Sequence, residues 1–141
     1  MPSPENTASE AEALIRHYYD TFNRGDREAM LALLAGDVVH DINHGETETG
    51  RDAFRRFLER MDGAYAEKVD DLVVMATPDG ARAAAEFFID GKYLKTDTGL
   101  PEATGQAYRL RVGAFFELSG GLIRRVTNYY NLADWLRQIG A

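Results

Sequence analysis

The chain has 141 residues and a mass of 15.7 kDa, a size that favours a single domain over residues 1–141. Its 23 acidic residues outnumber its 16 basic residues, and the net charge of −7 disfavours binding to nucleic-acid phosphates or anionic lipid heads. The absence of cysteine excludes disulfides, thiolate metal sites and cysteine nucleophiles. We therefore expect a cytoplasmic protein with no export signal, no membrane span and no nucleic-acid partner.

The first half of the sequence is typical of helices with one short strand. Residues 1–6 carry two prolines and are predicted to be a loose end. Thr7 and Glu10 resemble a capping box at the start of a helix that ends near Gly25. The further predicted elements are a short helix from Asp26 to Gly36, a strand over 37–43 and a helix that ends near Gly63.

The second half is rich in β-forming residues. Four consecutive antiparallel strands are predicted over 68–76, 81–94, 106–118 and 122–131, with turns at 78–80 and 119–121. The polar segment 95–105 between the middle two strands is long enough to form a rim or a lid. A short final helix begins after Asn131.

This order of elements predicts an α+β fold shaped like a cone. A curved, mixed or antiparallel sheet would wrap around three N-terminal helices, and a short C-terminal helix would follow. Such a shape leaves an apolar cavity for a small hydrophobic molecule between the first helix and the concave face. Because the strand over 106–118 is apolar on both faces, we also expect a homodimer through the outer sheet face.

Three segments of the chain are similar to a known group of proteins. They are HYYDTFNRGDREAMLALLAGDVVHDINHG, GRDAFRRFLERM and GAFFELSGGLIRRVTNYYNLADW. Together they resemble the nuclear transport factor 2-like superfamily, within it the branch of SnoaL-like polyketide cyclases and steroid delta-isomerases (ketosteroid isomerases). The resemblance implies a curved sheet around three helices, commonly in a dimer. It leaves the activity open, because isomerases, cyclases, dehydratases, epoxide hydrolases and noncatalytic binders share this scaffold.

Two residues are the predicted catalytic pair. Val39, Asp41 and Asn43 share one strand face, and a carboxylate on the face toward the helices would have a raised proton affinity. Asp41 also matches, by position, the proton-shuttling aspartate of ketosteroid isomerases. Tyr18 lies on the apolar side of the first helix, where its hydroxyl could donate to an enolate oxygen. It matches the oxyanion-hole tyrosine of these isomerases, and Tyr19 is the neighbouring alternative.

The sequence departs from the family pattern at two positions. Gly113 occupies the place of the second, protonated aspartate of the isomerases, a carboxylic acid whose pKa is raised by an apolar site. Asn128 occupies the place of an aspartate of the epoxide hydrolases in this superfamily, and an amide cannot act as a general base. These departures favour a repurposed cavity or one that only binds its ligand.

Other polar residues have open interpretations. Glu86 is a second carboxylate if it points inward and a surface charge if it points outward, which we favour. Arg109 and Arg111 could select an anionic substrate if their face is concave, although solvated strand charges are more frequent. His40 and His44 lie opposite Asp41 without an evident third metal ligand, so no metal is predicted, and His44 is a candidate mouth residue.

The sequence therefore predicts a small cofactor-free isomerase or cyclase that acts on an unknown hydrophobic carbonyl compound. Asp41 would move a proton and Tyr18 would stabilise the oxyanion. The alternative is a noncatalytic small-molecule binder or dimeric interaction module on the same scaffold, and a hydrolase is third. The predicted substrate-binding residues are Asn128, Tyr130, Asn43, Phe115, Phe88, Val126 and Phe57.

Overall fold

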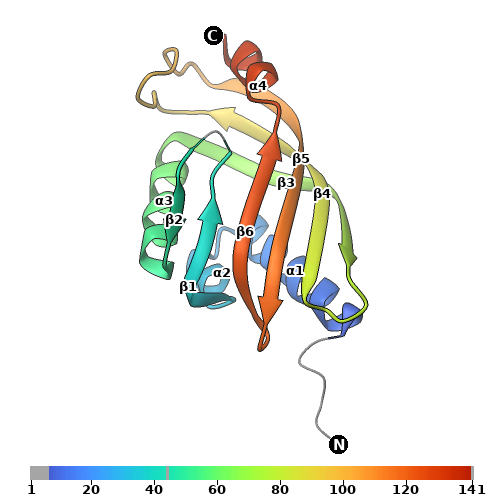
Figure 1. Cartoon of the computed structure of the whole chain (residues 1–141). Coiled ribbons are helices and arrows are strands. Elements are labelled where there is room, and N and C mark those ends of the chain that lie inside the picture. Colours follow the sequence, from blue (N-terminus) through green and yellow to red (C-terminus); the bar gives the residue numbers. More distant parts are fainter. Residues whose placement is uncertain (1–6, 44, 141) are drawn as a thin grey trace, which may run out of the picture.

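The computed structural model describes residues 7–43 and 45–140. In chain order the elements are α1 (Ala8–Arg24), α2 (Arg27–Leu31), β1 (Leu34–Asp41), β2 (Thr47–Thr49), α3 (Arg51–Ala64), β3 (Tyr65–Ala76), β4 (Arg82–Tyr93), β5 (Gln106–Ser119), β6 (Leu122–Tyr130) and α4 (Leu132–Ile139) (Figure 1). The predictions for residues 1–6 and for His44 lie outside the described residues.

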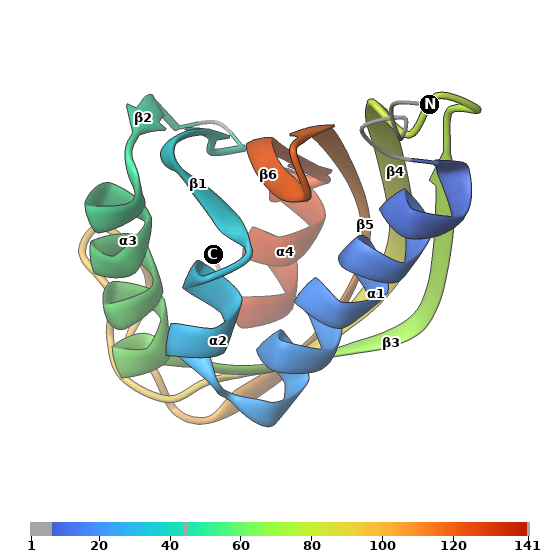
Figure 2. The same ribbon diagram turned by 90° about the horizontal axis from the view of Figure 1, so that it is seen from below.

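The strands form one six-stranded sheet in the order β2-β1-β6-β5-β4-β3. The pairs from β3 to β6 are antiparallel, as predicted, whereas β1 runs parallel to β6. Figure 2 shows the sheet curving around α1, α2 and α3 without closing, and Figure 1 shows α4 at one end. The predicted α+β class and the curved sheet around three helices are thereby confirmed.

Local sequence signals account for the ends of α1. The Thr7 hydroxyl accepts from the Glu10 N–H and the Glu10 carboxylate accepts from the Thr7 N–H, which completes the predicted capping box. Gly25 ends the helix with a φ of 72°, a left-handed conformation that glycine adopts without steric cost.

The region after α1 differs from the prediction. α2 ends at Leu31 instead of near Gly36, and β1 begins at Leu34, where it pairs with Ile123 of β6. Leu33 and Leu34 fit a helical spacing, but strand pairing with a distant segment decides their conformation. The polar segment predicted to be a loop before α3 contains the short strand β2, which pairs with β1.

A bulge adds one residue to β3 relative to β4 and changes which residue numbers face inward. The register against β4 shifts between Asp70 and Val73, and Asp71 has a φ of 55°. Before the bulge Val69 is buried, with odd-numbered neighbours on the same face, whereas after it Val74 is buried. The bulge therefore sets which β3 residues face the helices.

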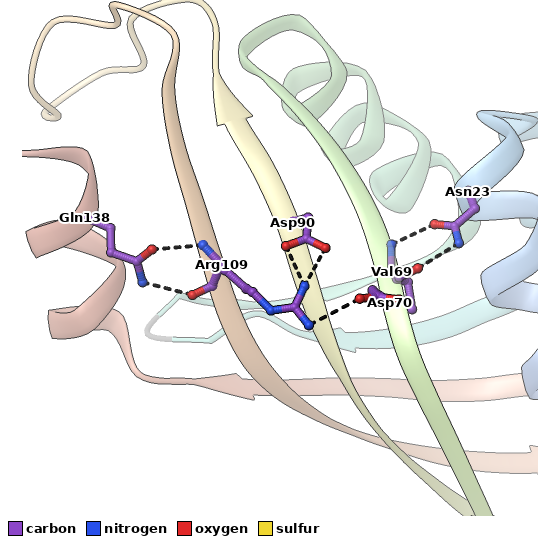
Figure 3. A network of polar contacts seen from close by, with 6 residues as sticks. All are labelled: Asn23, Val69, Asp70, Asp90, Arg109 and Gln138. Carbon is purple, nitrogen blue, oxygen red and sulfur yellow. Dashed lines mark hydrogen bonds and ion pairs between the residues drawn. The ribbon is translucent and has the colours of Figure 1, made fainter.

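Two side-chain amides pair with free strand backbone (Figure 3). The Asn23 amide at the end of α1 donates to the Val69 carbonyl at 3.0 Å and accepts from its N–H at 2.7 Å. The Gln138 amide of α4 makes the same pair of bonds with the backbone of Arg109, at 2.9 and 2.8 Å. Each amide replaces a missing neighbouring strand and fixes its helix to the sheet.

Among the described residues, no helix is long and apolar enough to span a membrane.

Candidate functional site

A cavity of about 400 Å³ lies between the helices and the inner, concave face of the sheet. Most of its wall is aromatic or aliphatic, which suits an apolar ligand. The aromatic lining residues are Tyr18, Tyr19, Phe22, Phe54, Phe57, Tyr65, Phe87, Tyr130 and Trp135. The polar groups among the lining residues include Tyr18, Tyr19, His40, Asn43, Glu67 and Asn128.

The Tyr18 side chain lies where the sequence predicted it. Its ring is buried and packs edge-on against Tyr19 and Phe116, with ring centroids 5.1 and 5.8 Å away. Burial raises the pKa of Tyr18 well above its ordinary value, so the phenol keeps its proton. Neither the Tyr18 nor the Tyr19 hydroxyl makes a hydrogen bond to another described residue, which leaves both available to a ligand in the cavity.

The predicted inward orientation of Asp41 is wrong. Asp41 pairs with Thr127, Thr127 with Phe115, and Phe115 with Ala84, so these four residues form one row on the outer face. The Asp41 carboxylate accepts hydrogen bonds from Thr127 at 2.7 Å, Thr47 at 2.8 Å and Arg125 at 2.5 Å.

These contacts also reverse the expected electrostatics of Asp41. The hydrogen bonds from Thr127, Thr47 and Arg125 stabilise the charged carboxylate and lower the pKa of Asp41 below its ordinary value. Asp41 is therefore an ionised group of a surface network that continues through Arg125 to Glu117, at 2.7 Å, and it does not line the cavity with Tyr18.

His40 takes the inward place on β1 that was predicted for Asp41. It pairs with Val126 on the inner face, is 3% exposed, and stacks on Phe54 with ring centroids 4.4 Å apart. Its Nδ1 atom is buried without a hydrogen-bond partner among the described residues. Burial lowers the pKa of His40 to about 4, so the ring is neutral near pH 7 and can bond to a ligand as a donor or an acceptor.

The predicted inward residue was also wrong in β4 and in β5, where each strand has two consecutive phenylalanines. Phe87 and Phe116 face the helices, whereas Phe88 lies beneath the guanidinium of Arg109 and Phe115 is 47% exposed beside Tyr129. Neither Phe88 nor Phe115 lines the cavity.

The same shift of one residue relocates the other candidates on these strands. Gly113 pairs with Glu86, whose carboxylate lies 3.4 Å from Arg111 on the outer face. Glu86 therefore points outward, as favoured, and Gly113 is not the gap left in the cavity by a missing acid. Arg109 is also on the outer face, where it binds Asp90 at 2.6 Å and Asp70 at 3.2 Å (Figure 3).

Most of the predicted substrate-binding residues do line the cavity. Asn128 and Tyr130 of β6, Phe57 of α3 and Asn43 all contribute to its wall. The Asn43 amide, just after β1, donates to the Tyr130 carbonyl at 3.1 Å. Val126 shares the inner face with Asn128 and Tyr130 but is buried in the core and does not line the cavity.

Glu67 is a cavity carboxylate on the inner sheet face that was not predicted from the sequence. It lies on β3 before the bulge, between the buried residues Tyr65 and Val69 of the same face. Its Oε2 atom accepts a hydrogen bond of 2.5 Å from the hydroxyl of Tyr108 on β5. Burial raises the pKa of Glu67 above its ordinary value, against the opposing effects of Tyr108 and Arg27.

The predicted strand over 68–76 did not include Glu67. Glu67 stands among charged residues in the sequence YAEKVDD, which is typical of an exposed segment. If the predicted strand had begun at Tyr65, three residues earlier, the alternation that places Val69 on the inner face would also have placed Glu67 there.

The loop over 95–105 lies against the cavity, at the predicted rim. Asp97, Thr98 and Leu100 contribute to the cavity wall. Tyr65 donates to the Asp97 carboxylate at 2.9 Å, and the Tyr93 hydroxyl donates to the Pro101 carbonyl at 2.7 Å. These bonds hold the loop in place.

Comparisons with known proteins agree with this architecture. The family model of the SnoaL-like domain matches residues 15–126, most of the chain. The chain belongs to the SnoaL-like domain family. No curated protein matches the sequence.

Solved structures of SnoaL-like relatives include two close matches. The crystal structure of a putative polyketide cyclase from Xanthomonas campestris pv. campestris is 50% identical, with a TM-score of 0.94, over 96% of this chain and 100% of that chain. The crystal structure of a putative polyketide cyclase from Pseudomonas putida KT2440 is 53% identical, with a TM-score of 0.91, over 92% of this chain and 98% of that chain. A putative ketosteroid isomerase from Kribbella flavida is 30% identical, with a TM-score of 0.63, over 88% and 79%.

The SnoaL-like cavity of this chain thus brings several kinds of polar group together. The Glu67 carboxyl can exchange a proton in an apolar environment, whereas the carboxylate of Asp97, in the loop at the rim, accepts a hydrogen bond from Tyr65. The phenols of Tyr18 and Tyr19 can donate to a ligand oxygen. Neutral His40 offers a further hydrogen-bonding group. Over residues 7–43 and 45–140, no cluster of three or more histidine or acidic side chains could hold a metal ion.

Proposed function

We propose that this SnoaL-like protein is an isomerase- or cyclase-type enzyme that transfers a proton next to the carbonyl group of a hydrophobic compound, with Glu67 as the proton carrier. The single observation that carries the proposal is the Glu67 carboxyl, which lines an aromatic cavity and has a raised pKa. A carboxylate that is poorly solvated is a stronger base than one in water, and its acid form persists closer to neutral pH.

The proposed reaction needs only side chains at the cavity. The Glu67 carboxylate would take a proton from the carbon next to the carbonyl, and the carbonyl oxygen would become an enolate. Tyr18, Tyr19 or His40 would donate a hydrogen bond to that oxygen, and protonated Glu67 would return its proton to a second carbon. The names of the relatives at 50% and 53% identity support a cyclase, and the name of the relative at 30% identity supports an isomerase, in preference to a hydrolase.

A chromogenic probe tests this proposal without knowledge of the substrate. In 5-nitrobenzisoxazole a base removes the C3 proton, the electron pair of the C–H bond forms the nitrile, and the N–O bond breaks to give a coloured phenolate. We expect saturable elimination by the protein, faster than with acetate at the same concentration. The rate should rise with pH to a plateau, with its midpoint above the ordinary pKa of glutamate, because only the ionised carboxylate is a base.

The probe also separates the enzyme from the noncatalytic alternative. Elimination no faster than with acetate, together with saturable binding of the probe, would contradict the proposed enzyme and support a small-molecule binder. A midpoint at or below the ordinary pKa of glutamate would show that another base is responsible.

We also propose that a second copy of this chain covers the outer sheet face. Phe115, Tyr129 and Met75 are about half exposed on β5, β6 and β3, where apolar side chains lose contact with water on association. The substitution Phe115→Asp should convert a dimer to a monomer, as measured by light scattering after size exclusion. The exposed loop substitution Glu102→Asp should leave the dimer intact, and a monomeric wild-type protein would contradict the proposal.

A further inference from the structure

Three residues on neighbouring strands lie in one row on the inner face of the sheet, and Glu67 is one of them. Glu67 of β3 pairs with Gly91 of β4, and Gly91 pairs with Tyr108 of β5. Directly paired residues project to the same face of a sheet. The Tyr108 ring crosses the middle strand over Gly91 and reaches the carboxylate two strands away, with an O–O distance of 2.5 Å.

We propose that Tyr108 is a positioning residue that holds the Glu67 carboxyl in one orientation in the cavity, and that Gly91 makes this contact possible. The inference rests on the proposed role of Glu67. Tyr108 and Gly91 would together set the orientation of the group that carries the proton.

Space, and not backbone conformation, explains the glycine at position 91. Gly91 lies in the middle of β4 and does not have a positive φ, so its backbone suits any residue. A Cβ atom built there would lie 2.3 Å from Cζ and 2.6 Å from the hydroxyl oxygen of Tyr108. Any side chain at position 91 would therefore displace the ring that bonds to Glu67.

Among the described residues, Tyr108 is the one hydrogen-bond donor to the Glu67 carboxylate. The other charged groups act over longer distances: Arg27 of α2 favours the ionised form, and Asp62 of α3 opposes it. The phenols of Tyr65 and Tyr130 also line the cavity, and the Glu67 charge contributes to raising their pKa values, after the larger effect of burial. Removing the Tyr108 hydroxyl would leave the carboxylate with no directional contact to the protein.

The titration of Glu67 tests the inference without any substrate. Carbon-13 NMR of the labelled Glu67 carboxyl would give its pKa in the wild-type protein and in Tyr108→Phe, which keeps the ring. Loss of a hydrogen bond to the charged form should raise the pKa of Glu67 by about one pH unit. The midpoint of the probe reaction should rise with it. Tyr129→Phe, on the exposed outer face, should leave both values unchanged.

The substitution Gly91→Ala tests the role of the glycine. It should also raise the pKa of Glu67, because the added Cβ displaces the Tyr108 ring. The matched control is Gly113→Ala on β5, where an added Cβ makes only an ordinary contact of 3.9 Å with Phe115. In the background Tyr108→Ala, adding Gly91→Ala should have no further effect on the titration.

These outcomes distinguish failure of this inference from failure of the proposed function. An unchanged pKa of Glu67 in a folded Tyr108→Phe variant would overturn the positioning role, even if the wild-type protein transforms the probe. An equal effect of Gly91→Ala with and without the Tyr108 side chain would overturn the role of Gly91. A rise in both variants supports the inference, even if wild-type protein fails to accelerate the probe reaction.

Discussion

Replacing Glu67 by glutamine is expected to lower kcat for the elimination of 5-nitrobenzisoxazole by at least about 100-fold, because a positioned general base contributes roughly 100- to 10,000-fold. Glutamine keeps the size of the side chain and can still accept a hydrogen bond from Tyr108, but it cannot take up the proton. The KM for the probe should change little, since the aromatic wall of the cavity is unaltered. Stopped-flow absorbance of the released phenolate measures both constants.

The matched control is Asp41→Asn, which makes the same chemical change on the other face of the sheet. Asp41 binds Thr127 and Arg125 outside the cavity, so kcat should stay within about twofold of the wild-type value. The opposite pattern, with activity lost in Asp41→Asn and retained in Glu67→Gln, would contradict the proposed proton carrier.

Acidification is expected to destabilise the protein through His40. The folded protein holds this ring neutral, with a pKa of about 4, whereas an unfolded chain titrates near the ordinary value of 6.5. Between these values the unfolded state binds more protons, so the free energy of unfolding decreases as the pH falls. The loss should reach about 2 kcal/mol near pH 5 and about 3 kcal/mol near pH 4.

The variant His40→Phe should remove this part of the pH dependence. Phenylalanine keeps a ring against Phe54 and Phe57 and does not titrate. Urea unfolding at a series of pH values would give the free energy of unfolding of both proteins. The wild-type protein should lose more stability than His40→Phe between about pH 7 and pH 4, by roughly 3 kcal/mol.

Another histidine provides the control for this experiment. His17 lies exposed on α1, so His17→Gln should follow the wild-type pH dependence. If wild-type protein and His40→Phe lose stability in parallel on acidification, then His40 titrates normally in the folded state.

The succession of the helices and the longer strands could be predicted from the sequence because its signals are local. The capping box at Thr7, the glycine at position 25 and the turn sequences between the long strands each act over a few residues. The border between α2 and β1 could not be predicted in this way, because Leu34 takes its conformation from pairing with Ile123, a residue far away in the sequence.

Which strand residues face the cavity was harder to predict than the strands themselves. Alternation gives no answer where both faces are apolar, as at the adjacent phenylalanines 87–88 and 115–116. In β1, alternation placed His40 and Asp41 on opposite faces but did not show which of the two faces the helices, and the pairing with β6 shifts register between Leu34 and Val39. The inward position of Tyr18 was predicted correctly because a helix presents its apolar side over several turns.

The bulge in β3 lets this strand carry one residue more than its partner without changing which side chains face the cavity. Val69 pairs with Ile89 before the bulge and Val74 pairs with Ala85 after it, and both pairs lie on the inner face. Deleting one residue near Asp71 would restore regular pairing and leave Glu67 opposite Gly91 on the inner face. Homologues with and without the extra residue would therefore keep the same cavity wall, although their residue numbers differ by one on one side of the bulge.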